Sequence, residues 1–183
     1  MSDGARLGGA RRVRRLVVSI VAAVVVVVGV VVALGFTAGG AQGAPSFSYP
    51  RLGGGAPVRY PLAGTQAHRP VVVAFFASWC SPCRTELPTV AQVARQAQRR
   101  HSPVVFVGID GNDEAASGLA FARRSGVTFP VGADADSALA PRFGLDGYPD
   151  TVFVNASGQV AHVVRGPVSR AVLEQWVSRL AAP

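Results

Sequence analysis

The sequence contains no lysine and only two cysteines, and both scarcities restrict the functions it can have. Eighteen arginines carry all of the positive side-chain charge, against ten acidic residues, for a formal net charge of +8. Five of these arginines precede residue 16, and the rest of the chain has no basic run longer than two residues. A nucleic-acid surface normally concentrates its positive charge more strongly. The distribution of charge therefore argues against a nucleic-acid partner.

The same scarcity of cysteine argues against a metal site. A structural zinc ion takes four ligands, but the chain has no second Cys-x-x-Cys motif, and its three histidines lie far apart in the sequence. The acidic residues Asp110, Asp113 and Glu114 lack the ligand spacing of a calcium loop and are typical of the acidic start of a helix. We therefore expect neither a metal nor another cofactor.

Charge is also missing from a long stretch near the N-terminus. Residues 16–36 are apolar and uncharged, and about 20 such residues suffice for one transmembrane helix. The arginines before them predict a cytoplasmic basic segment, 1–15, and a single-pass anchor in the cell membrane with everything after it extracytoplasmic. Two alternatives remain open: a cleaved signal peptide ending near residues 41–44, followed by secretion, and a twin-arginine export signal.

The remaining chain divides into a linker and one domain. Residues 37–56 are rich in Gly, Ala, Ser and Pro, a composition that predicts a flexible tether. Residues 57–183 are long enough for one buried core and too short for two.

Hydrophobic periodicity predicts an α/β domain. Expected strands cover 58–62, 71–77, 104–109, 151–154 and 160–164. Expected helices cover 81–100, 114–125 and 134–143, and a last helix begins after an N-cap at Ser169. The continuous apolar run 71–77 predicts a central strand buried on both faces, with an active loop at its C-terminal end.

That loop contains both cysteines, in Trp79-Cys80-Ser81-Pro82-Cys83. A helix that starts inside the motif favours the thiolate form of the first cysteine. Spacing of i and i+3 on a first helical turn suits the Cα separation of a disulfide, about 4.4 to 6.8 Å. We therefore predict redox chemistry, with Cys80 as the more exposed nucleophile of lower pKa and Cys83 as the shielded resolving cysteine. A fixed structural disulfide is the alternative.

Two segments resemble one protein family. WCSPCRTELP at 79–88 and GYPDTVFVNASGQV at 147–160 are similar to motifs of the TlpA/ResA/DsbE-like, membrane-anchored thiol–disulfide oxidoreductases of the thioredoxin superfamily, and 108–144 fits that branch's helical insertion. The resemblance implies a thioredoxin-like fold, a mixed central sheet flanked by helices. It also implies protein thiols or disulfides as substrates, with apocytochrome c in cytochrome c maturation as the family's best-known one, and a membrane electron donor or acceptor as partner.

The resemblance also suggests roles for individual residues. Pro149 should follow a cis peptide bond and leave the backbone of Tyr148 free to bind a substrate strand. Trp79 should offer an apolar docking surface, the alternative being core packing. Ser81 and Pro82 complete the active-site loop and help to set the reduction potential, although their identity does not indicate whether the protein reduces or oxidises its substrates.

One position departs from plain thioredoxin, whose buried aspartate before the motif falls here at Ala74. Glu86, one turn after Cys83, is the nearest replacement as proton acceptor. The alternative for Glu86 is a solvated helix acid that pairs with Arg84 or Arg95. For the whole chain, the alternatives are an oxidative disulfide-forming protein, a peroxiredoxin-like peroxidase and a non-enzymatic holder of apoproteins or copper.

Overall fold

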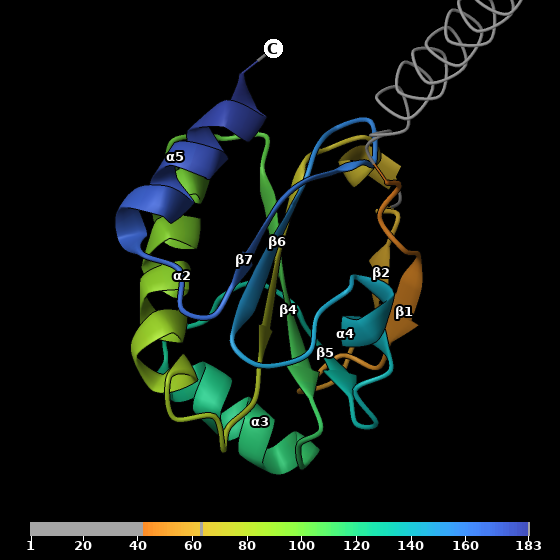
Figure 1. Ribbon diagram of the computed structural model, residues 1–183, viewed down its shortest axis with the longest axis vertical. Coiled ribbons are helices and arrows are strands. Elements are labelled where there is room, and N and C mark those ends of the chain that lie inside the picture. The colour runs from red at the N-terminus through yellow and green to blue at the C-terminus, as the bar shows by residue number, and fades with distance from the viewer. Residues whose placement is uncertain (1–41, 63, 183) are drawn as a thin grey trace, which may run out of the picture. The chain divides into compact units, whose positions relative to one another are not determined.

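The computed structural model describes residues 42–62 and 64–182 (Figure 1). Among them, no helix combines the length and apolar character that a membrane crossing requires. The predicted basic segment 1–15 and the predicted span 16–36 lie outside the described residues, as does the start of the predicted tether, 37–41.

A five-stranded mixed sheet forms the centre of the domain, in the order β5-β4-β3-β6-β7. Its strands, listed in that order, are Val131–Asp134, Val105–Gly111, Val71–Phe76, Asp150–Val154 and Val160–Arg165. β3 pairs in parallel with β4 and antiparallel with β6, and all six of its residues are buried. The predicted central strand is therefore confirmed, and its β-branched and aromatic residues fill both faces of the sheet.

The two faces of the sheet are covered differently (Figure 1). Val72 and Ala74 of β3 pack in one core cluster with apolar residues of α2 (Cys83–Arg99) and α5 (Arg170–Ala181). Val71, Val73 and Phe75 point the other way, toward β1 (Phe47–Tyr49), β2 (Val58–Tyr60) and α4 (Leu139–Arg142). A third cluster joins Phe76 and both cysteines to Phe121 of α3 (Ala115–Arg124). The predicted mixed sheet with flanking helices is thus confirmed.

The predicted tether is wrong for residues 42–56. β1 (Phe47–Tyr49) and β2 (Val58–Tyr60) form an antiparallel pair, and Phe47 and Leu52 are buried. Residues 42–52, which we call the edge segment, also bond to both outer strands of the sheet: Val160 N–H donates to the Gln42 carbonyl, and Leu52 N–H to that of Val131. The folded unit therefore includes residues from 42 onward, because isolated apolar side chains in a Gly/Pro-rich stretch find partners far along the chain.

The predicted helix 134–143 is also mostly wrong. β5 runs to Asp134, and α4 begins only at Leu139. The Asp134 carboxylate accepts hydrogen bonds from the backbone N–H groups of Ala138 and Leu139, at 3.1 and 2.9 Å, which fixes the turn between the two elements. A short 3₁₀ turn, η1 (Gly64–Gln66), precedes β3.

The remaining predictions agree with the structure to within a few residues. Ser169 caps α5, accepting a hydrogen bond from the Val172 N–H. β6 and β7 form the expected hairpin, whose turn is held by the Asn155 side chain accepting from the N–H groups of Ser157 and Gln159.

Candidate active site

The two cysteines lie between the end of the central strand, β3, and the first turn of the following helix, α2. β3 ends at Phe76, and α2 begins at Cys83. Cys80 and Cys83 form a disulfide, with their Cα atoms 5.3 Å apart, and the Cys83 N–H donates to Cys80 Sγ at 3.2 Å. Such a bond from the first turn of a helix stabilises negative charge on the acceptor sulfur. Cys80 is 3% exposed and Cys83 is fully buried, so the expected difference in exposure is small.

The chain around the disulfide is open to solvent. Ser81 and Pro82 are exposed, and Trp79, at 55%, is the one exposed large hydrophobic side chain in the described part of the chain. The Trp79 indole donates to the Asn112 carbonyl at 2.7 Å. Core packing, the alternative for Trp79, is therefore wrong.

The second motif lies beside the first. The Trp79 and Tyr148 rings meet edge to face, with centroids 5.8 Å apart, and the Tyr148–Pro149 peptide bond is cis as expected. Tyr148 is half-buried, and its hydroxyl lies 2.5 Å from Ser137 Oγ. Gly111 makes room for this phenol, because a Cβ there would lie 2.6 Å from Tyr148 Cζ. The fold thus brings together residues that are about 70 positions apart in the sequence.

Glu86 lies in α2, three residues after Cys83, and is buried, with 6% of its surface exposed. One carboxylate oxygen accepts from the Val168 N–H at 2.8 Å, and the other from the Thr151 hydroxyl at 3.4 Å. Burial raises the pKa of Glu86 to about 7, although both hydrogen bonds oppose the shift. The alternative of a solvated acid paired with arginine is wrong. Thr151 is the cross-strand partner of Ala74, the position at which the resemblance puts the aspartate of thioredoxin, so Glu86 bonds to a direct neighbour of that position.

Two further buried acids lie near the site, and neither was predicted to function there. Asp150, directly after Pro149, accepts from the Gly166 N–H at 2.8 Å, and burial is the main cause of its raised pKa. Asp110 ends the apolar part of β4, and burial, then the charge of Asp113, raises its pKa to about 8. In the sequence, each of these two acids stands out only as an acidic residue directly beside an apolar segment.

The described part of the chain holds no cluster of three or more metal-ligating side chains.

Comparison with known proteins agrees with the sulfur chemistry. The model of the AhpC/TSA family matches residues 41–163. Over 111 residues, the chain is 25% identical to the thiol-disulfide oxidoreductase ResA of Oceanobacillus iheyensis, covering 61% of this chain and 57% of that protein. The chain thus spans less than two thirds of the length of this curated relative.

Solved structures match over nearly their whole length. A thioredoxin-family thiol:disulfide interchange protein from Chlorobium tepidum has a TM-score of 0.66 and 30% identity, covering 77% of this chain and 97% of that one. A secreted Mycobacterium tuberculosis disulfide oxidoreductase, homologous to E. coli DsbE, has a TM-score of 0.63 and 28% identity, covering 73% and 96%.

Proposed function

Because the chain belongs to the AhpC/TSA family and has a thioredoxin-like fold, we propose that it is a thiol–disulfide oxidoreductase that exchanges disulfides with proteins through Cys80 and Cys83. One observation carries the proposal: the disulfide lies at the start of α2, beside an exposed tryptophan. A purely structural disulfide has no need of an exposed aromatic next to it.

In the reducing direction, the reaction begins with the Cys80 thiolate. It attacks one sulfur of a substrate disulfide, so that the substrate S–S bond breaks and a mixed disulfide forms, while the other substrate sulfur leaves and takes up a proton. The Cys83 thiol loses its proton and attacks Cys80 Sγ. This step restores the Cys80–Cys83 disulfide and releases the second substrate thiol. Two electrons pass from protein to substrate, and the oxidising direction is the reverse.

Glu86 is placed to handle the proton of the resolving step. It lies one helical turn after Cys83, and its pKa of about 7 allows it to accept or return a proton near neutral pH. Trp79, Tyr148 and Pro149 form the docking surface for the substrate, and Ser81 and Pro82 form the exposed loop over the disulfide.

The substrate class and the location follow from the resemblance. We propose extracytoplasmic protein thiols as substrates, apocytochrome c among them, a membrane protein as electron donor or acceptor, and residues 16–36 as a membrane anchor. The secreted M. tuberculosis relative supports the extracytoplasmic side. N-terminal sequencing of the mature full-length protein tests the anchor. Retention of 16–36 in a membrane fraction is expected, and a start near residues 41–44 would indicate a cleaved signal.

The redox function is tested by thiol alkylation across a series of glutathione buffers. We expect Cys80 and Cys83 to become alkylated together as the buffer turns reducing, and the midpoint gives the reduction potential. A disulfide that stays closed under strong native reductant would show a structural role. Hydrogen peroxide consumption, measured in parallel, would reveal a peroxidase.

The Cys83→Ser variant identifies the substrates. It should accumulate mixed disulfides through Cys80, whereas the double variant with Cys80→Ser should accumulate none and serves as the matched control. Equal non-covalent co-purification of the same proteins with both variants, under conditions that reduce mixed disulfides, would support the non-enzymatic holder.

A further inference from the structure

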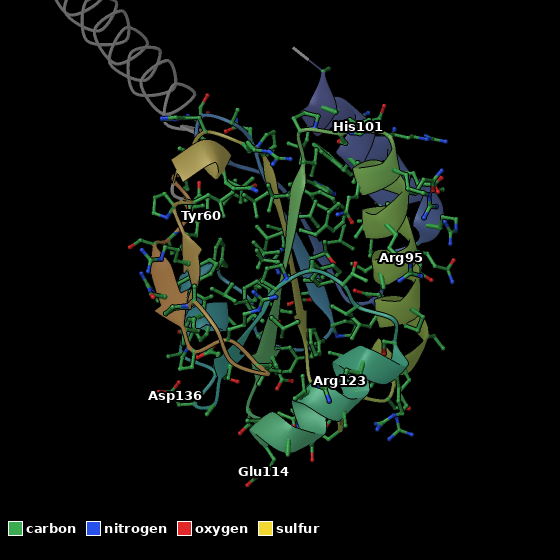
Figure 2. The ribbon with its side chains drawn as sticks, turned by 180° about the vertical axis from the view of Figure 1, so that it is seen from behind. Tyr60, Arg95, His101, Glu114, Arg123 and Asp136 are labelled. Carbon is green, nitrogen blue, oxygen red and sulfur yellow. A yellow bond between two sulfur atoms is a disulfide. The ribbon has the colours of Figure 1, made fainter. Side chains whose placement is uncertain are left out.

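An open cavity of about 420 Å³ lies between α2 and α3, beside the active loop. Its lining combines two arginines, two serines and two apolar residues, namely Ser78, Arg84, Pro88, Phe121, Arg124 and Ser125. The two helices meet there, because Leu87 of α2 and Phe121 of α3 share a core cluster with both cysteines, and Figure 2 shows α3 against the N-terminal end of α2. The steps of the exchange reaction give this cavity no role.

The cavity is close to both cysteines. Arg84 directly follows Cys83, and Ser78 precedes Cys80 by two residues. Consecutive Cα atoms are about 3.8 Å apart, so each of these two lining residues has its Cα atom within about 8 Å of a cysteine Cα atom. A substrate disulfide that reaches Cys80 therefore brings the residues beside it to the cavity.

Neither arginine of the cavity has a counter-ion. In the described part of the chain, the one ion pair joins Arg170 to Glu174, on α5. Arg84 and Arg124 are both exposed, and a guanidinium group stays charged at any physiological pH. Two like charges beside one cavity repel each other, and an anion between them removes the repulsion. The cavity is therefore suited to a negatively charged group.

The acids of the neighbouring elements are bonded to other groups. The Asp113 carboxylate accepts from the N–H and the hydroxyl of Ser78, at 2.5 and 2.9 Å. Glu86 of α2 accepts from Thr151 and Val168. Two positive charges at the cavity thus stand against the one carboxylate of Asp113, and a net positive charge is left.

We propose that this cavity is a subsite for an acidic side chain, Asp or Glu, that lies next to the disulfide of the protein substrate. Arginine suits such a ligand, because its planar guanidinium group bonds both oxygens of a carboxylate. Pro88 and Phe121 supply apolar contact for the methylene groups of the same side chain. The subsite rests on the proposed function, since it selects among substrates of the exchange reaction.

The first test compares two cyclic peptide disulfides that differ only in Glu or Gln next to a cysteine. The reduced full-length protein converts each peptide to its dithiol and becomes oxidised, and each rate constant is divided by that with dithiothreitol to remove the intrinsic reactivity of the peptide. We expect the Glu peptide to react about fivefold faster at low salt, near the upper end for exposed ion pairs. The preference should disappear in about 1 M NaCl, where the Debye length is about 3 Å.

The arginine variants use the ratio of the two rates, because a change in Cys80 reactivity affects both peptides equally. Arg84→Gln and Arg124→Gln should each bring the ratio to within about twofold of one. The matched control, Arg123→Gln, removes the same charge from the neighbouring exposed position of α3, outside the cavity lining (Figure 2), and should keep the preference. Equal rates of the two peptides in the parent protein, or an equal loss of preference in Arg123→Gln, overturns the proposal.

The second test separates the subsite from the exchange function. A Glu peptide with both cysteines replaced by serine is added to the oxidised, ¹⁵N-labelled full-length protein, so that no thiol or disulfide exchange takes place. We expect the Nε–H signals of Arg84 and Arg124 to shift, those of Arg123 to stay, and the Gln peptide to shift none of them. Such shifts in a protein that fails to exchange disulfides would refute the proposed function and support the anion site. Unchanged signals, with normal exchange, would overturn the subsite alone.

Discussion

Glu86 and Val168 are joined by a 2.8 Å hydrogen bond from the Val168 N–H to the Glu86 carboxylate, across 82 residues of sequence. With the Thr151 hydroxyl on the other oxygen, the acid links α2, β6 and the loop before α5. Burial raises its pKa to about 7. The group proposed to move the proton of Cys83 is therefore also a fixed part of the core.

Replacing Glu86 by Gln should separate these two roles. Gln can still accept the Val168 N–H bond, but it cannot take up the proton of Cys83. We expect the second, resolving step to slow by about 100-fold, since a positioned general base contributes roughly 10²- to 10⁴-fold. Rapid-mixing measurement of Cys80–Cys83 disulfide formation checks this.

The matched control is Glu174→Gln, which neutralises an exposed acid that pairs with Arg170. It should leave the rate and its pH dependence unchanged. If Glu86→Gln behaves like this control, Glu86 has no role in proton transfer.

The buried acids predict how stability depends on pH. Glu86, Asp110 and Asp150 all have pKa values raised by burial, to about 7 for Glu86 and about 8 for Asp110. Between pH 4.5 and 8 the folded protein therefore binds more protons than the unfolded chain, and the free energy of unfolding should fall as the pH rises through this window. Urea unfolding at pH 5 and pH 8.5 measures the loss.

The double variant Glu86→Gln/Asp110→Asn should make the free energy of unfolding depend less on pH, because it removes two acids whose pKa values are raised to about 7 and about 8. A stability that rises from pH 5 to pH 8.5 in the natural sequence would contradict the burial of these acids in their neutral form.

Short-range patterns predicted the elements that depend on local sequence. The apolar run of β3, the spacing of the two cysteines and the Ser169 cap act over a few residues, and each appears in the structure. Pairing over long distances was not predictable in this way. β5 is only four residues long and is defined by its register with β4.

In the candidate site, too, local sequence predicted some features, and contacts between distant segments determined the others. The spacing placed Glu86 one turn from Cys83, but its burial depends on Thr151 and Val168, which no local pattern connects to it. Asp110 was assigned to a helix start, since the close approach of Gly118 that buries it is a tertiary contact. Both misjudged environments arise where distant segments meet.

Replacing Trp79 or Trp176 by alanine should have opposite effects: the first should reduce activity and the second should reduce stability. Trp79 is exposed, so Trp79→Ala should change the free energy of unfolding by less than about 0.5 kcal/mol. If it docks substrates, the variant should lose about tenfold in kcat/KM toward a protein disulfide and much less toward oxidised glutathione.

Trp176 provides the contrast. It packs against Phe153, stacks on His162 and lies under Arg179. Trp176→Ala should therefore cost roughly 3 kcal/mol of stability and leave the exchange kinetics of the folded protein unchanged. A loss of exchange in Trp176→Ala and not in Trp79→Ala would refute the docking surface.

The N-cap of α5 should make a measurable contribution to the free energy of unfolding. Ser169→Ala removes the oxygen that accepts the Val172 N–H at 3.3 Å and should cost about 1 kcal/mol by urea unfolding. Ser178→Ala, at an exposed position inside the same helix, should be neutral or slightly stabilising, because alanine is the better helix former there. Equal effects would mean that the cap bond contributes nothing.

The edge segment also affects how the domain behaves in a crowded solution. Outer strands of a sheet present free backbone groups on which another chain can add a strand, and proteins cover such edges to avoid aggregation. Residues 42–52 occupy part of both edges, at Val131 of β5 and at Val160 of β7. A chain trimmed at residue 57 would retain its cysteines and its central sheet, but it would expose these backbone groups and be prone to associate edge to edge with its own copies.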